Sequence, residues 1–139
     1  MLVIDVLDDA VPMAEALVRG GLPNLEVTLR TDIALAAVER IVREVPDANV
    51  GVGTVRTVDD IRRAWDVGAT FAVSPGLTPP LSKLEHSIPL LPGAMTPTEV
   101  MTAYDAGFAC QKLFPASFAG GADFLRALAG PLPDVTFCP

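Results

Sequence analysis

The chain has 139 residues, of which 50% are hydrophobic, and a formal net charge of −7. That is enough for one folded domain with a sizeable core, and it argues against disorder. Its apolar runs are far shorter than the roughly 20 residues that cross a bilayer, and the acidic start does not resemble a secretory leader. Nucleic acid and anionic membranes are excluded as expected partners, because both bind basic surfaces.

Short β-branched runs recur along the chain, and such runs predict strands. The expected strands are VIDV (3–6), LEVTLR (25–30), NVGVGTV (49–55), FAVS (71–74), IPLLP (88–92), CQKLF (110–114) and VTFC (135–138).

Helix signals separate these runs from the start of the chain onward. Asp8 or Asp9 is expected to cap the first helix, and Gly20-Gly21 to end it. In the second helix, apolar residues recur at three- and four-residue steps and predict one buried face. These residues are Leu35, Val38, Ile41, Val42 and Val45, and Pro46 follows them.

The later helices begin at recognisable caps. Thr57 and Asp60 have the spacing of a capping box. Thr78-Pro79 opens a shorter helix, and His86, at the end of that helix, is expected to be solvated. Thr96-Pro97-Thr98-Glu99 supplies a cap, an early proline and a glutamate at the third position. Every pair of expected strands is therefore joined by a crossover and not by a hairpin, which predicts parallel pairing.

The ends of the expected strands distinguish two parallel architectures. A dinucleotide-binding fold has one glycine-rich loop after its first strand, whereas a (β/α)₈ barrel builds its site from many strand ends. Here polar or special residues follow many strands: Glu26 to Arg30, Thr54, Ser74-Pro75-Gly76, Pro92-Gly93 and Lys112. We expect residues 1–139 to form one α/β domain, an incomplete (β/α)₈ barrel that stops near its seventh strand.

Side chains alternate between the two faces of a strand. This places Glu26, Thr28 and Arg30 on one face, and Cys110, Lys112 and Phe114 on one face of a later strand. Because helices cover the outside of a barrel, we expect both polar sets to face its interior.

Lys112 is the most unusual of these residues, because it is one of only two lysines and lies in an apolar strand. Burial favours the uncharged amine, which attacks keto groups and forms a Schiff base. Glu26 is then the expected acid and base. Arg30 and Thr54 are expected to bind a carboxylate.

Structural alternatives remain open for each of these residues. Lys112 is equally compatible with an ion pair to Glu26 that has no chemical role. Glu26 and Arg30 also fit an exposed pair at the rim. The glycines of Gly51-Val52-Gly53-Thr54 are compatible with close packing alone. Cys110 and Cys138 fall in apolar segments, which is typical of reduced, buried thiols in a cytoplasmic protein.

Six motifs resemble one known family, in its order and at its spacing. They are LEVTLRT (25–31), VGVGTV (50–55), FAVSPGLT (71–78), IPLLPGAMTPTE (88–99), KLFPAS (112–117) and LAGPLPDVTFCP (128–139). Together they resemble the bacterial 2-keto-3-deoxy-6-phosphogluconate (KDPG) aldolases, also called 4-hydroxy-2-oxoglutarate (KHG) aldolases. SPGLT and the Phe-Pro-Ala after the lysine are more similar to this branch than to the phosphogalactonate aldolases.

The resemblance implies a class I aldolase on a (β/α)₈ barrel, with no metal or other cofactor and with a homotrimeric assembly. Its substrates would be small molecules, namely pyruvate and a phosphorylated keto-deoxy sugar acid. It makes Lys112 the Schiff-base lysine and Glu26 the general acid and base. Arg30 and Thr54 would bind the pyruvate carboxylate, and Phe114 and Pro75 would line the pyruvate pocket.

Members of the family are longer than this chain, and the glycine-rich turns that hold their substrate phosphate follow the Phe-Cys-Pro motif. We therefore expect a C-terminally truncated chain whose phosphate recognition is impaired. An inactive fragment is the alternative hypothesis. A phosphate-binding epimerase or synthase barrel is a weaker one, since it does not explain the lysine at position 112.

Overall fold

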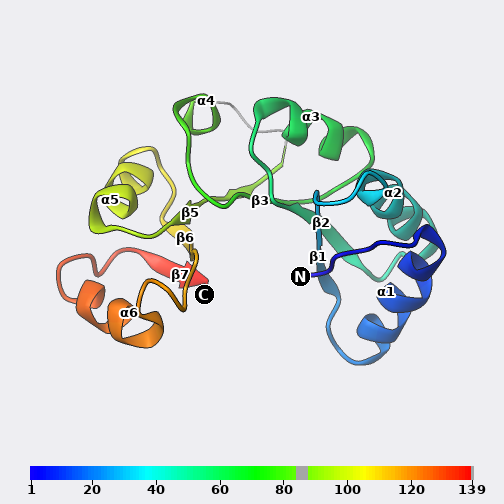
Figure 1. The fold of residues 1–139 in the computed structure, drawn as a ribbon, viewed down its shortest axis with the longest axis horizontal. Coiled ribbons are helices and arrows are strands. Elements are labelled where there is room, and N and C mark those ends of the chain that lie inside the picture. Colours follow the sequence, from blue (N-terminus) through cyan, green and yellow to red (C-terminus); the bar gives the residue numbers. More distant parts are fainter. Residues whose placement is uncertain (84–87, 139) are drawn as a thin grey trace. The chain divides into compact units, whose positions relative to one another are not determined.

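The structure is a computed structural model that describes residues 1–83 and 88–138 (Figure 1). Two compact units divide the chain. The first contains Met1–Val73 and the segment that ends at Leu90, and the second contains the segments that begin at Ser74 and at Leu91. The prediction that His86 is solvated lies outside the described residues.

The strands form two sheets. The first has the order β1 (Asn24–Thr28), β2 (Asn49–Gly53), β3 (Ala72–Val73) and β4 (Leu90–Leu91). The second has the order β5 (Gly93–Ala94), β6 (Cys110–Leu113) and β7 (Thr136–Cys138). The described pairings β1–β2, β2–β3, β5–β6 and β6–β7 are all parallel, which confirms the crossover interpretation.

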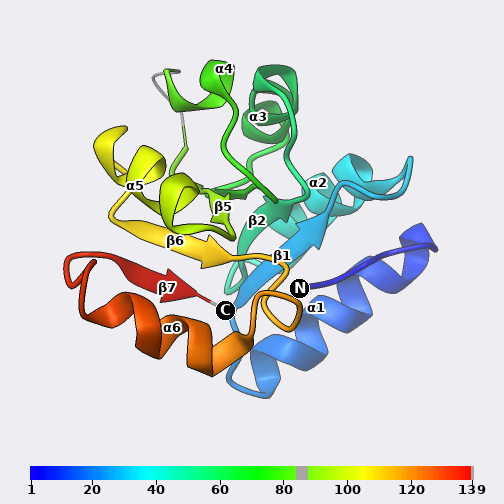
Figure 2. The same ribbon diagram turned by 60° about the vertical axis from the view of Figure 1, so that its left-hand side comes forward.

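The first two helices precede β1, and the later ones lie in the connections between the strands, as Figure 2 shows for α6 beside β6 and β7. They are the short 3₁₀ helix η1 (Leu7–Asp9) and the α-helices α1 (Ala10–Arg19), α2 (Ala34–Glu44), α3 (Val58–Asp66), α4 (Pro79–Ser82), α5 (Pro97–Asp105) and α6 (Gly121–Ala129). Helix α6 was not among the expected helices.

Two of the expected strands differ from the structure. VIDV forms none: only Leu2 bridges β1, where its N–H donates to Glu26 O at 2.6 Å and its carbonyl accepts from Thr28 N at 2.9 Å. The chain then turns into η1, so this prediction is wrong. IPLLP is a strand only at Leu90–Leu91, and Pro92, which has no N–H to donate to a ladder, separates β4 from β5.

The buried face of α2 is shifted from the expected one. Val38 and Ile41 are fully buried, as predicted, but Val42 is 37% exposed. Small residues complete the stripe instead, since Ala34 and Ala37 are buried at helical spacing from Ile41. Alanines therefore allow α2 to approach the rest of the unit closely.

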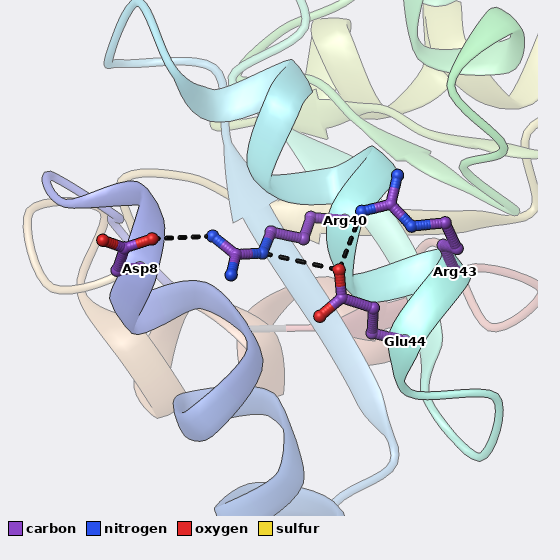
Figure 3. A network of polar contacts seen from close by, with 4 residues as sticks. All are labelled: Asp8, Arg40, Arg43 and Glu44. Carbon is purple, nitrogen blue, oxygen red and sulfur yellow. Dashed lines mark hydrogen bonds and ion pairs between the residues drawn. The ribbon is translucent and has the colours of Figure 1, made fainter.

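A network of exposed charges joins η1 to α2 (Figure 3). Arg40 Nη1 lies 2.8 Å from Asp8 Oδ1, and Arg40 Nε lies 3.5 Å from Glu44 Oε1, which also lies 2.7 Å from Arg43 Nη2. The hydrogen bond to Asp8 raises the pKa of Arg40, and the one from Arg43 lowers the pKa of Glu44. Exposed pairs of this kind contribute little to the free energy of unfolding, so the network links η1 to α2 without adding much to the stability of the fold.

Both predicted capping boxes are present. Thr57 Oγ1 accepts from Asp60 N at 3.1 Å, and Asp60 Oδ2 accepts from Thr57 N at 2.9 Å. At α5, Thr96 Oγ1 accepts from Glu99 N at 3.2 Å, and Glu99 Oε2 accepts from Thr96 N at 2.9 Å. The helices that follow β2 and β5 therefore begin at fixed residues.

The cysteines are free, as predicted, but both are exposed, so the expectation of buried thiols is wrong. Cys110 lies on the face of β6 opposite to the buried Gln111 and Leu113. In residues 1–83 and 88–138, no helix combines the length and the apolar character needed to span a membrane.

Candidate functional site

In the first unit, Glu26 lies at the middle of β1 and is half-buried. Its carboxylate occupies the space beside Gly53 of β2, because a Cβ atom placed on Gly53 would overlap with Glu26 Oε1. A residue without a Cβ atom is therefore required at position 53, because the side chain of Glu26 fills that space. Gly51 instead makes room for the ring of Phe71, so its role is packing, as the structural alternative proposed.

Arg30 and Thr54 meet at the carboxyl ends of β1 and β2. Arg30 Nε donates a hydrogen bond to Thr54 Oγ1 at 3.2 Å. Thr54 has a φ of 63°, in the left-handed region that β-branched residues rarely adopt. Backbone strain of this kind costs about 1–3 kcal/mol and gathers at functional sites. A guanidinium beside a hydroxyl is a donor pair suited to a carboxylate.

In the second unit, Lys112 occupies the centre of the three-stranded sheet. It lies in β6, half-buried, in register with Gly93 of β5 and Cys138 of β7. Its Nζ atom lies 5.4 Å from the centroid of the Phe114 ring, within the range of a cation–π contact. The lysine side chain thus leaves the sheet on the face opposite to Gln111 and Leu113, as the predicted alternation requires.

A hollow of about 350 Å³ lies beside Phe114 within the second unit. Pro75 and Phe114 both line it, together with Glu99 at the start of α5. Gly93 lets the chain pass there, because a Cβ atom on it would overlap with the Pro75 carbonyl group. The sequence-predicted residues Pro75 and Phe114 are therefore brought to one surface.

The structure assembles the predicted residues in two groups, each within one unit. Glu26, Arg30 and Thr54 belong to the first unit, whereas Lys112, Phe114 and Pro75 belong to the second. Within the described part of the chain, no group of three or more His, Cys, Asp or Glu side chains is arranged to hold a metal ion.

Sequence analysis missed one polar residue of this region. Gln111 is fully buried, and its amide donates to the carbonyl oxygens of Val100 and Phe108. The sequence did offer a signal for this burial, namely a polar residue next to a lysine in a short apolar strand. Neighbouring side chains point to opposite faces of a strand, so one of the two must face the helices that cover the sheet.

The fold class is that of a (β/α)₈ barrel, of which this chain supplies a part built from parallel strands and crossover helices. The family model described as KDPG and KHG aldolase matches residues 1–139. The chain belongs to this aldolase family.

Relatives with known names support the assignment. The chain is 49% identical over 141 residues to the KHG/KDPG aldolase of Escherichia coli (strain K12). It has the same identity over the same length to the 2-dehydro-3-deoxy-phosphogluconate aldolase of Dickeya dadantii (strain 3937). In both comparisons the match covers 100% of this chain and 66% of the relative. The chain thus spans just under two thirds of the relatives' length.

Solved structures agree with the sequence comparison. The KDPG aldolase from Legionella pneumophila, with pyruvate captured at low pH as a covalent carbinolamine intermediate, has a TM-score of 0.96 and 43% identity, covering 100% of this chain and 68% of that one. The 2-keto-3-deoxy-6-phosphogluconate aldolase of Zymomonas mobilis ZM4, with 3-phosphoglycerate, has a TM-score of 0.95 and 46% identity, covering 99% and 66%.

Proposed function

We propose that this protein acts as a class I aldolase. It would cleave 2-keto-3-deoxy-6-phosphogluconate to pyruvate and glyceraldehyde 3-phosphate, and 4-hydroxy-2-oxoglutarate to pyruvate and glyoxylate. The observation that carries the proposal is Lys112, a half-buried lysine at the centre of a parallel sheet, in a chain that matches the aldolase family throughout. The carbinolamine trapped in the Legionella relative supports the same chemistry.

In the proposed reaction, the neutral amine of Lys112 attacks the keto carbon C2 of the substrate and forms a carbinolamine. Loss of water gives a protonated Schiff base. The C4 hydroxyl then loses its proton to a base, the C3–C4 bond breaks, and its electron pair moves through C2 to the imine nitrogen. The aldehyde leaves, the resulting enamine takes a proton at C3, and water releases pyruvate from the lysine.

Glu26 is the proposed proton carrier in these steps. It is the carboxylate that Gly53 accommodates on the first sheet, and a positioned carboxylate of this kind contributes about 10²–10⁴ in rate. It would take up the proton of the C4 hydroxyl and deliver one to C3. Both transfers use one group, which returns to its starting state at the end of each cycle.

The remaining predicted residues would hold the pyruvate half of the substrate. Arg30 and Thr54 already form a hydrogen-bonded donor pair, and this pair would bind the C1 carboxylate. Phe114 and Pro75 line one hollow and would exclude water from C3, the carbon that takes up a proton. Excluding water strengthens the electrostatic interactions of the charged intermediates.

The wider setting of the enzyme is part of the proposal. We infer a single catalytic domain over residues 1–139, a cytoplasmic location, a homotrimeric assembly, and catalysis with no cofactor besides the lysine. The Entner–Doudoroff pathway is the corresponding place in carbohydrate metabolism. The names of the relatives support the reaction class, and the acidic composition supports the absence of nucleic acid and membrane partners.

Trapping with pyruvate and borohydride tests the proposal. Reduction would fix the Schiff base as a stable adduct, which peptide mass spectrometry would locate on Lys112. Because the only other lysine is Lys83, the variants Lys112→Met and Lys83→Arg form a matched pair. We expect loss of the adduct in the first and an unchanged adduct in the second. A folded protein that forms no adduct would support the inactive fragment instead.

A further inference from the structure

Gln111 is a buried amide directly beside the lysine of the proposed site. Its side chain is 0% exposed, and it lies on the face of β6 opposite to Lys112. Its Oε1 atom has no hydrogen-bond partner in the described part of the chain. An apolar side chain of similar size would avoid burying that acceptor. The glutamine therefore carries a desolvation cost that the buried Leu113 on the same face avoids, and the hydrogen bonds of its amide must offset that cost.

The donors of this amide are used completely. Gln111 Nε2 donates to Val100 O at 3.0 Å and to Phe108 O at 2.9 Å. Val100 belongs to α5, and Phe108 lies in the segment that leads from α5 to β6. A primary amide has two N–H groups, so the two carbonyl oxygens match its donors one for one.

This geometry matters because β6 is short. Its ladder contacts β5 only through Gly93 and Ala94, and β7 through three residue pairs. A strand that slips by two residues keeps its faces and changes only its height. An apolar residue would pack in either register, but the amide finds both carbonyl oxygens in only one of them.

The same contact joins the lysine to a fixed helix. The capping box of Thr96 and Glu99 defines where α5 begins, and Val100 lies one turn from that start. Gln111 then connects α5 to the strand that carries Lys112. We infer that Gln111 is a positioning residue, which sets the height and direction of the Lys112 amine by binding the two carbonyl oxygens. This inference rests on the proposed function for its catalytic consequence.

The test compares Gln111→Met with Leu113→Val. Methionine keeps the length of the side chain and removes both donors. The control removes one methylene from the same buried face and keeps the amide. At saturating pyruvate, we expect the rate of borohydride-trapped adduct formation to fall about 10- to 100-fold in Q111M, because a full 1 Å displacement costs about 100-fold and a smaller one costs less. The half-saturating pyruvate concentration should stay the same, since pyruvate is bound by other residues.

Lys83 provides an internal reference that does not depend on pyruvate chemistry. It is exposed in the second unit, and an amine-reactive ester labels both lysines of the chain. We expect the labelling of Lys112 relative to Lys83 to change in Q111M and to stay constant in L113V. Gln111→Glu, which donates one hydrogen bond while protonated, should fall between wild type and Q111M.

The outcomes separate the two claims. Equal adduct rates in wild type and Q111M would overturn the positioning role and leave the proposed function standing. A wild type without adduct, together with an altered labelling ratio in Q111M, would overturn the proposed function and retain the positioning of the lysine. Equal losses of rate in Q111M and L113V at equal losses of thermal stability would show that Gln111 acts only through packing, and would overturn the inference.

Discussion

The sheets of the two units are built differently. In the first, β1 and β2 pair continuously from Asn24 with Asn49 to Thr28 with Gly53. In the second, β5 has two residues and β7 has a largely exposed pattern. The largest fully buried side chains divide in the same way. Those of the first unit are Ile4, Val27, Val38, Ile41, Val50, Val52, Val55 and Ile61, and those of the second are Leu81, Val100, Gln111 and Leu113.

The difference shows two ways to hold a reactive side chain. Glu26 stands on the continuous pairing of β1 with β2, and Gly53 leaves space for its carboxylate. Lys112 stands on a short strand with a thinner core, and polar contacts provide the missing constraint: the amide of Gln111 and the capping box of α5. We therefore expect changes beside Glu26 to act on proton transfer, and changes beside Lys112 to act on the position of its amine.

The largest expected effect comes from the carboxylate of the first unit. Glu26→Gln keeps the size of the side chain and removes its proton transfer, so turnover should fall by about 10²–10⁴. Glu39→Gln, on the exposed side of α2, is the matched control and should leave turnover unchanged. Pyruvate release measures both. Full activity in the Glu26 variant would show that the first unit does not supply the acid and base.

Truncations in the two cores should differ in their cost. Ile41→Ala removes a side chain that is 0% exposed, and Leu128→Ala one that is 5% exposed. Large-to-small changes of this kind cost about 2–5 kcal/mol. The half-buried neighbours of Leu128, which are Phe124, Leu132, Val135 and Phe137, can relax into the space, so we expect the smaller loss there. Urea unfolding measures both values, and the reverse order would contradict the comparison.

Gly53→Ala should separate position from stability. The added methyl group displaces the carboxylate of Glu26, and we expect turnover to fall about tenfold, below the roughly hundredfold cost of a full 1 Å misplacement. Gly130→Ala is the control, since a Cβ atom there meets nothing within 4 Å. Turnover and thermal unfolding are measured together. A loss of stability that accounts for the lost turnover would remove the special role of Gly53.

The smallest expected effect concerns the helix caps. Thr57→Ala and Thr96→Ala should each cost about 1 kcal/mol. The N–H of Met95, followed by the hydrogen bonds from Thr96, lowers the pKa of Glu99 below its ordinary value of 4.5. The contribution of the Glu99 carboxylate to the free energy of unfolding is therefore fully present above the pKa that this group has in the unfolded chain. It is lost as the pH falls through the lower pKa that the group has in the folded state.

Acid titration of stability checks this direction. Relative to wild type, Glu99→Gln should be destabilised at pH 7, and the difference should shrink as the pH falls below about 4.5, the ordinary pKa of a glutamate. A difference that grows on acidification would contradict the assigned role of the carboxylate.

Much of this arrangement could be predicted from local patterns. Thr57 with Asp60 and Thr96 with Glu99 begin helices where their spacing indicated. The strand around Glu26 and the strand around Lys112 also lie within the stretches predicted for them. These signals succeed because capping and alternation depend on neighbours within a few residues.

The failures depend on contacts that no repeating pattern encodes. VIDV has the composition of a strand, but only Leu2 pairs with β1 before the chain turns into η1. Alternation places Gln111 on the face opposite to Lys112, but it does not reveal that the carbonyl oxygens of Val100 and Phe108 accept from its amide there. The proposed roles of Lys112, Glu26, Arg30, Thr54, Phe114 and Pro75 remain predictions for the experiments above.

The left-handed backbone of Thr54 also places a limit on improving this protein. A glycine at this position would adopt the same φ without strain, so a search for stabilising substitutions would favour it. The same substitution would delete the hydroxyl group that accepts from Arg30. Selection for robustness and selection for carboxylate binding therefore oppose each other at one residue, and a library sorted on thermal tolerance alone should lose Thr54 first.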